Sequence, residues 1–177
     1  MKRFLFILIA VLLAFGLASC SALKGGVWSA DNRQTAEDRF QQIMMAIEEK
    51  DTEGLKNMFS PNALEEAEDI DGGIAYFLDF FKGDNWRSTD LAYVADTSTG
   101  HGDISITIEC KSTVVAKGTY IIFFIDIIKD TKDPDNVGLY MIQILKEPYT
   151  KEEFDWGTEI ECAGVYIPDA GEQEDET

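Results

Sequence analysis

The sequence predicts an α+β protein in which helices precede an antiparallel sheet. From residue 31 to residue 81, apolar side chains recur at intervals of three and four, which is the spacing of one helix face. From Leu91 onward they alternate with polar side chains, which is the period of a strand. Helices grouped ahead of a run of strands favour a single domain with the N-terminal helices packed on one face of a curved antiparallel sheet.

Capping residues divide the helical half into four segments. The first helix is expected to begin at Asp31, whose carboxylate is a suitable N-cap. A short helix should restart at Asp51-Thr52, and a third at Ser60-Pro61, because Ser caps helices and Pro suits their first position. Asp71-Gly72-Gly73 is expected to interrupt this third helix, and Lys82-Gly83-Asp84 to end the helical half.

The strand half is expected to form a meander. Ile104–Cys110 alternates strictly between apolar and polar residues, so one face of this strand should be buried. A turn at Lys117-Gly118 leads into Tyr120–Lys129, which is apolar on both faces and should therefore be central and covered on both sides. Val137–Lys146 is the next strand, and Gly164–Pro168 is a last edge segment.

The N-terminus has the pattern of an export signal. Two basic residues precede Phe4–Leu17, a stretch of fourteen apolar or glycine residues that is shorter than the roughly 20 needed to span a bilayer. The following Leu17-Ala18-Ser19-Cys20 resembles the lipobox of bacterial lipoproteins, in which the cysteine is acylated and becomes residue one. This resemblance implies a signal peptide over residues 1–19 and a lipidated Cys20 with its tether over residues 20–30. The domain would then stand outside the cytoplasm, anchored to the cell membrane.

The charge balance excludes several partners. The 177 residues include 33 Asp and Glu against 15 Lys and Arg, a formal net charge of −18. Nucleic acid is not expected as a partner, because a phosphate backbone needs clustered Lys and Arg. The hydrophobic fraction of 45% suits a folded domain, expected over residues 31–168. Residues 169–177 hold five acids and no base, so we expect a disordered tail there.

Several short motifs accompany this order of elements. They are the lipobox, Ser60-Pro61, Phe80-Phe81-Lys82-Gly83, Asn136-Val137-Gly138 and Gly164-Val165-Tyr166. Together with the element order, over about Asp31 to Pro168, they resemble the nuclear-transport-factor-like (SnoaL-like, cystatin-type) fold. More narrowly, they resemble a group of Gram-positive lipoproteins of that fold with no assigned function. The resemblance implies a cone-shaped domain whose open end is often a small-molecule pocket, both in dehydratases and isomerases and in proteins that only bind.

Asp126 is the main candidate for a functional side chain. It interrupts the apolar face of the central strand between Phe124 and Ile128, where a desolvated carboxylate is a candidate general base or ligand anchor. The alternative is that Asp126 is exposed near the end of the strand, or pairs with Lys111 or Lys117. Aromatic residues that would line a cleft for an apolar ligand, unless they are ordinary core, are Phe77, Phe81, Trp86, Tyr93 and Tyr140.

Other candidates have simpler explanations. His101, the single histidine, lies between two glycines and is expected in a solvated loop rather than in a catalytic pair. Asp133-Pro134-Asp135-Asn136 begins like a calcium loop, but Val137 and Ile144 stand where oxygen ligands are needed, so we expect a turn. No metal or cofactor is expected. Cys110 and Cys162 remain once Cys20 is lipidated, and they either form a disulfide or are two buried residues that never meet.

Three functions remain open. The leading interpretation is a non-catalytic, membrane-anchored envelope protein that binds a small apolar ligand or a partner protein. The second is a pocket enzyme of the lyase or isomerase type that uses Asp126 as its base. The third is an accessory subunit of an envelope complex, in which the second apolar face of Tyr120–Lys129 forms an interface, including a homodimer through the sheet. A filled cone with an exposed apolar sheet face would favour the third.

Overall fold

The computed structural model describes residues 26–149, 154 and 162–168, and shows helices followed by strands. The helices are α2 (Gly26–Glu49), α3 (Thr52–Lys56), α4 (Pro61–Glu66), α5 (Ile70–Phe80) and a 3-10 turn, η1 (Pro134–Asn136). The strands are β1 (Arg87–Gly100), β2 (Asp103–Val115), β3 (Thr119–Asp130), β4 (Gly138–Lys146) and β5 (Gly164–Tyr166). The predicted signal peptide, the lipidated Cys20 and the acidic tail lie outside the described residues.

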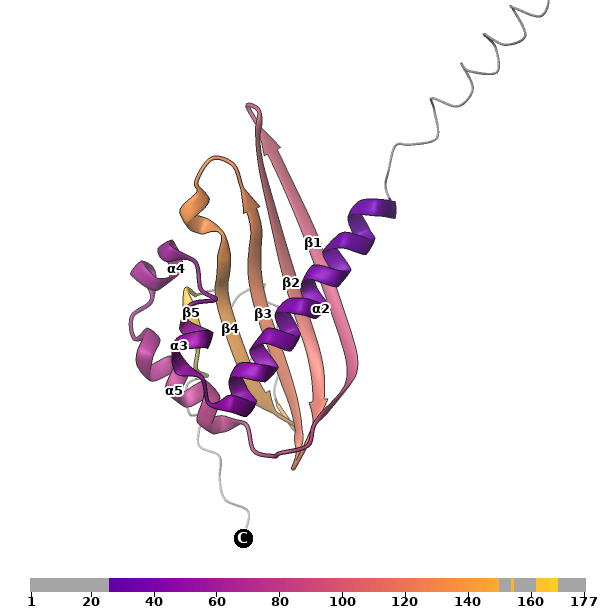
Figure 1. Cartoon of the computed structure of the whole chain (residues 1–177), viewed down its shortest axis with the longest axis vertical. Coiled ribbons are helices and arrows are strands. Elements are labelled where there is room, and N and C mark those ends of the chain that lie inside the picture. The colour runs from indigo at the N-terminus through magenta and orange to yellow at the C-terminus, as the bar shows by residue number, and fades with distance from the viewer. Residues whose placement is uncertain (1–25, 150–153, 155–161, 169–177) are drawn as a thin grey trace, which may run out of the picture.

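The strands form one open sheet in the order β1-β2-β3-β4-β5, and the helices lie across one of its faces (Figure 1). This arrangement confirms the predicted α+β class. The prediction of an antiparallel sheet is correct for β1 to β4, but β5 pairs with β4 in parallel, so the sheet is mixed. The long connection after Lys146 explains the difference, because it returns the chain to the end of the sheet from which β4 starts.

The longest helix, α2, starts earlier than predicted. It begins at Gly26, within the predicted tether, so Asp31 is not its N-cap. The backbone carbonyl of Asp31 instead accepts a bond from the hydroxyl of Thr35, one turn further on (2.9 Å). Once a helix is nucleated, each added residue gains a backbone hydrogen bond at low cost, and residues 26–30 contain no proline to stop this extension.

The predicted caps at Asp51 and Ser60 are confirmed. Each side chain accepts a bond from the backbone N–H three residues later, at 2.8 and 3.1 Å. The predicted break at residues 71–73 is misplaced, because α4 already ends at Glu66 and Asp69 caps a new helix. The Asp69 carboxylate accepts from the N–H of Gly72 (2.9 Å), so both glycines lie in the first turn of α5.

Gly73 allows α5 to approach the edge of the sheet closely. A Cβ atom built at this position would lie 2.8 Å from the Cβ of Val165 in β5, which is closer than side chains tolerate. The glycine is therefore required by packing between the two elements, which explains why a residue of low helix propensity is found inside a helix.

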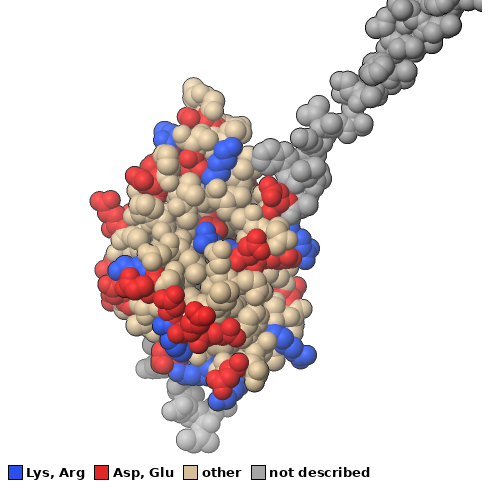
Figure 2. Space-filling view, in the orientation of Figure 1, with Lys and Arg blue, Asp and Glu red and all other residues tan. Residues whose placement is uncertain are grey.

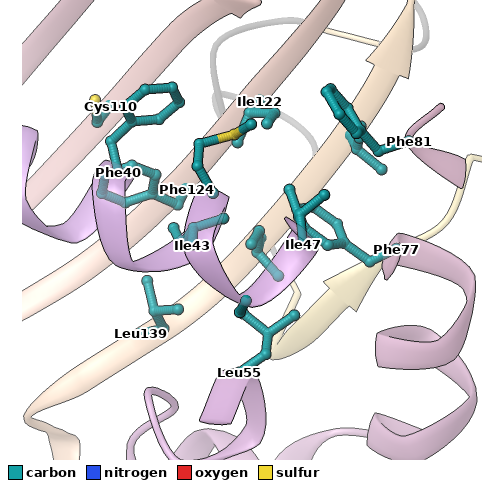
Figure 3. Close-up of a cluster of buried hydrophobic side chains, with 14 of the residues drawn as sticks. Phe40, Ile43, Ile47, Leu55, Phe77, Phe81, Cys110, Ile122, Phe124 and Leu139 are labelled. Carbon is teal, nitrogen blue, oxygen red and sulfur yellow. The ribbon is translucent and has the colours of Figure 1, made fainter. Parts of the chain in front are cut away.

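The main core lies between the helices and the sheet. Fully buried side chains from α2, α5, β2 and β3 interlock there, as Figure 3 shows for Phe40, Ile43, Phe77, Cys110 and Phe124. The apolar stripe predicted for the first helix faces this core. Full burial of a side chain of this size contributes about 1.5–3 kcal/mol, so this cluster is the main source of stability.

A second core covers the opposite, outer face of β3 and β4. Its buried members are Ile121, Phe123, Ile125, Met141, Leu145 and Phe154. Strand β3 is thus central and buried on both faces over most of its length, as its continuous apolar sequence predicted. Phe154 belongs to the connection between β4 and β5, so this face is closed by the chain itself.

The edge of the sheet that is formed by β1 is open to solvent. Most of β1 is exposed, and its hairpin with β2 turns at His101 and Gly102, both of which have positive φ angles (54° and 97°). Two such residues form the turn whose twist matches that of paired strands. His101 is exposed, so the predicted solvated loop position is confirmed.

Candidate functional site

Asp126 is buried on the helix-facing side of β3. It is only 1% exposed, and it lies opposite Leu139 of β4, next to an irregularity in strand pairing at Ile125 and Asp126. The position on the same face as Phe124 agrees with the alternation of the sequence. The possibility that Asp126 is exposed near the end of the strand is therefore wrong.

The buried carboxylate of Asp126 is held by Arg39 of α2. The guanidinium Nε donates to Oδ2 at 2.8 Å, and Nη2 donates to Oδ1 at 3.4 Å. Arg39 Nη1 also donates to Oε1 of Gln42, one turn further along the helix (3.0 Å). Two parallel bonds between a guanidinium and a carboxylate form a strong and directional pair. This ion pair therefore fixes the helix α2 on the sheet.

An open cleft of about 330 Å³ lies beside the ion pair. It is lined by Thr35, Asp38, Arg39, Gln42, Asp126, Ile127, Ile128 and Val137. Three of the five guanidinium N–H groups are engaged, which leaves two donors for an oxygen acceptor. Both oxygens of Asp126 accept bonds from Arg39, so the carboxylate anchors the arginine at the wall of the cleft.

The alternative in which Asp126 pairs with Lys111 or Lys117 is wrong, because its partner is Arg39. Lys111 instead places its ammonium 5.5 Å from the ring centroid of Phe154, on the other face of the sheet. Arg39 was not identified from the sequence, although it lies beside the apolar stripe of its helix. A basic residue at the border of a helix stripe and a lone acid in an apolar strand face are complementary. That combination is the signal that could have connected them.

The aromatic candidates do not form a common cavity in the described structure. Phe77 and Phe81 are buried, and the ring of Phe81 lies 4.8 Å from that of Tyr120. Trp86 packs edge-on against Phe40 at 5.9 Å and donates its indole N–H to Glu48 (2.7 Å). The two remaining candidates, Tyr93 and Tyr140, are partly buried and pack against the core. Core packing therefore accounts for all five positions.

The apolar outer face of β3 is covered rather than exposed. The ring of Phe154 packs edge-on against Phe123 at 5.4 Å and against Tyr149 at 5.9 Å. The part of this face over β3 and β4 is therefore covered by residues of the same chain, and a homodimer through the sheet stays a prediction. Phe154 was not recognised from the sequence, because residues 147–163 show no clear period and the tertiary contact alone gives this ring its role.

Cys110 and Cys162 are free, so of the two alternatives the one without a disulfide is found, with Cys110 buried and Cys162 partly buried. Cys110 lies in β2, and Cys162 lies just before β5, with two strands between them. Neighbouring strands lie about 4.8 Å apart, so this separation is roughly twice the 7 Å limit for Cα atoms of a disulfide. Burial raises the pKa of the Cys110 thiol to about 12, and burial also raises the pKa of Cys162.

The loop that resembles a calcium site is closed by its own hydrogen bonds. Asn62 of α4 donates to Asp133 (3.1 Å) and to Asn136 (2.7 Å), and Asn136 donates to Asp130 (3.0 Å). The backbone N–H of Asp133 and the side chain of Asn136 lower the pKa of Asp130. Over the described residues no group of three or more His, Cys, Asp or Glu side chains gathers as a metal site. The expected turn is confirmed.

A second open cleft, of about 520 Å³, lies at the end of the domain where α2 and α5 finish. Lys50, Lys82 and Lys117 line it together with acidic residues that include Glu48 and Asp79. Lys82 pairs with Asp79 at 2.9 Å, which lowers the pKa of that carboxyl, and Lys50 donates to the carbonyl of Leu78 at the end of α5. Lys50 and Lys82 therefore help to hold this end of the fold together.

Comparison with known proteins identifies a family without a described function. No curated protein matches the chain. Among the described residues, the helices lack the combination of length and apolar character needed to cross a membrane. A family model described as a domain of unknown function (DUF5104) matches residues 42–147, from the second half of α2 to the residue after β4. This match covers more than half of the chain, which therefore belongs to the DUF5104 family.

Proposed function

We propose that this protein is a lipid-anchored, extracytoplasmic binding module that acts through its surface and catalyses no reaction. The observation that carries this proposal is the filled interior between the helices and the sheet. Phe40, Phe77 and Phe124 meet there at full burial, where the resemblance implied a pocket. A buried ligand of drug size needs a cavity of about 300–1,000 Å³ enclosed by the protein, whereas the clefts described above are open to solvent.

The arrangement around Asp126 argues against the enzyme alternative. A general base must lie within hydrogen-bond reach of the proton that it removes. Asp126 is 1% exposed, and its two oxygens accept bonds from Arg39. His101, the other residue type common in such enzymes, lies in the distant turn between β1 and β2. These two residues therefore do not form an acid–base pair.

The lipid anchor is supported by the sequence alone. Cys20 follows a short apolar segment within Leu17-Ala18-Ser19-Cys20, and two or three acyl chains on it would hold the protein firmly, because each buried methylene contributes about 0.8 kcal/mol. We also propose that the domain is a nuclear-transport-factor-like fold. The helices on one face of the sheet and the meander β1 to β4 support this relationship, while the parallel β5 is an addition.

Native mass spectrometry of the full chain, extracted from its membranes in mild detergent, tests the binding mode. We expect a species without any bound small molecule, either alone or together with a partner protein. An adduct of a few hundred daltons that survives desalting would contradict a surface-binding role and would favour a ligand pocket. In that case the mass of the adduct would be the first clue to its chemistry.

Membrane fractionation of a Cys20→Ala variant tests the anchor separately. We expect the variant to leave the membrane fraction or to remain unprocessed, because the acylated sulfur is lost. Cys162→Ala is the matched control, since it removes a thiol of the folded domain that has no role in the proposed anchor. This variant should fractionate like the unaltered chain. Full membrane retention of a Cys20→Ala variant that is processed to the same mature length as the unaltered chain would contradict the lipoprotein assignment.

A further inference from the structure

The outer edge of β1 is an unpaired strand edge of unusual length. The strand has 14 residues, and it pairs with β2 from Arg87↔Val115 to Gly100↔Asp103. No other strand of the described structure lies beyond it, as the free side of β1 in Figure 1 shows. Such an edge presents a row of backbone donors and acceptors that an extended segment can pair with.

The two edges of the sheet are protected to different degrees. At the other edge, β5 has three residues and is followed by Pro168, which prevents the strand from being extended. Strand β1 has one irregularity in its pairing, between Ser88 and Asp90, and from Asp90 to Gly100 it contains no proline or lysine and keeps a regular register. Since proline, inward lysine and bulges are the usual means of blocking an edge, this part of β1 is accessible to another strand.

Side chains on the outer face of β1 form a defined pattern. Asp90, Ala92, Val94 and Asp96 share this face, because Leu91, Tyr93 and Ala95 face the main core. Both acids are exposed, and Val94 is 55% exposed. Two carboxylates therefore flank two small apolar side chains at the free edge.

The charge of this pattern selects the occupant. Acidic side chains are spread over the visible surface with basic ones scattered among them (Figure 2), and the chain carries a net charge of −18, so a second copy would be repelled. On β2, Lys111 lies opposite Ala92 and Glu109 lies opposite Val94, so the neighbouring strand carries one charge of each sign at the centre of this pattern. Asp90 and Asp96 lie opposite Thr113 and Thr107, which carry no charge, so their carboxylates favour bases at the two ends of an incoming strand.

We infer that β1 binds an extended segment of a partner protein by strand addition, and that this segment carries Lys or Arg six residues apart with apolar residues between them. The inference rests on the proposed surface-binding function and specifies its site. Cross-strand pairing would place the two bases opposite the acids and the apolar residues beside Ala92 and Val94. Backbone pairing would provide affinity, and the two charge pairs would set the register.

Peptide binding to the full chain in mild detergent tests this inference. The probe is Lys-Thr-Val-Thr-Val-Thr-Lys with blocked termini, used up to millimolar concentration. The control is Val-Thr-Lys-Thr-Lys-Thr-Val, which has the same composition and charge but places its bases at the centre. We expect the probe to bind about fivefold more tightly and to slow hydrogen exchange at alternate amides between residues 90 and 98. Equal binding of the two peptides, or no slowed exchange in β1, would overturn the inference.

A pair of variants distinguishes binding at the edge of β1 from a general attraction of the basic peptide to an acidic protein. Replacement of Asp90 and Asp96 by Asn should weaken binding of the probe about fivefold, because two exposed charge pairs are lost. Replacement of Asp79 and Asp84 by Asn makes the same change in charge away from the edge and should leave binding within twofold. Equal weakening in both variants would contradict a specific site. If the protein without peptide has twice the expected mass and its β1 amides exchange slowly, the occupant of the edge is a second copy of the chain. That result would overturn the inference of a basic partner segment.

Failure of this inference can be distinguished from failure of the proposed function. A bound small molecule in the native mass spectrum would contradict the surface-binding role, whatever the peptide does. Absence of protection in β1 would remove the strand-addition site but leave a binding role for another surface of the protein.

Discussion

The two faces of the sheet are closed by different means. The helix-facing side is covered by α2 and α5, whose buried side chains interlock with those of β2 and β3, and the Arg39–Asp126 pair fixes α2 in place. On the outer side, six buried residues form a smaller cluster that covers only β3 and β4, with Phe154 as the covering ring. The outer face of β1 is left exposed. The difference shows that stability is concentrated around β3, while β1 remains available for contact with other molecules.

The largest effect is expected when the helix-facing side loses its ion pair. Arg39→Met leaves the Asp126 carboxylate buried without its partner, and such a loss costs about 3–5 kcal/mol of the free energy of unfolding. Urea denaturation measures this change. Because the cost comes from an unpaired charge, the double variant Arg39→Met/Asp126→Leu should recover most of the stability. A double variant as unstable as the single one would show that the ion pair itself is not what fixes α2.

The outer face should respond to the loss of a single ring. Phe154→Ala removes the ring that packs against Phe123 and Tyr149, and we expect a loss of about 3 kcal/mol in the free energy of unfolding, at the lower end for buried Phe. Ile167→Ala is the control at an exposed position just after β5. It should change the free energy of unfolding by less than about 0.5 kcal/mol. Similar small effects of both variants would mean that Phe154 does not close this face.

The buried thiol of Cys110 makes the stability of the helix-facing side depend on pH. Cys110 is buried on the helix-facing side with a pKa of about 12, so its thiol stays protonated in the folded protein to higher pH than in the unfolded chain. As pH rises above about 9, the unfolded chain loses this proton first, and stability should fall, by about 1.4 kcal/mol at pH 10. Comparison of urea midpoints with those of Cys110→Ala isolates this effect.

Alkylation of the native protein provides a second measurement on the same thiols. With iodoacetamide at pH 8 and peptide mapping, Cys162 should react faster, because it is only partly buried, while Cys110 should react only on unfolding. Fast reaction of Cys110 in the folded state would show that the helix-facing side opens readily.

The smallest expected effect is at the N-cap of α5, the helix that packs against β5. Asp69→Ala removes the carboxylate that accepts from the N–H of Gly72, and should cost about 1 kcal/mol. Asp84→Ala removes an exposed acid that does not cap a helix and is the matched control. An equal change in both variants would indicate a general charge effect instead of capping.

Local rules predicted most of the elements, and contacts between distant residues account for what was missed. Ser60 and Asp51 were recognised as caps because capping depends on neighbours within three residues. The two buried faces of β3 followed from its continuous apolar sequence. The Arg39–Asp126 pair joins residues 87 positions apart, and the position of Phe154 depends on a folded sheet, so neither could be predicted from local sequence. The break before α5 was misplaced because Asp69 outweighs the helix-breaking tendency of two glycines.

The parallel β5 has a consequence for the order in which the protein folds. Strands β1 to β4 are joined by hairpin connections, so each can pair with the strand just before it in the chain. Strand β5 pairs with β4 across a separation of 23 residues (Met141↔Gly164) and also needs α5 in place, since Val165 packs against Gly73. Contacts with long sequence separation form at a greater entropic cost. We therefore expect the meander to form first and the edge strand to dock last, completing an already folded domain.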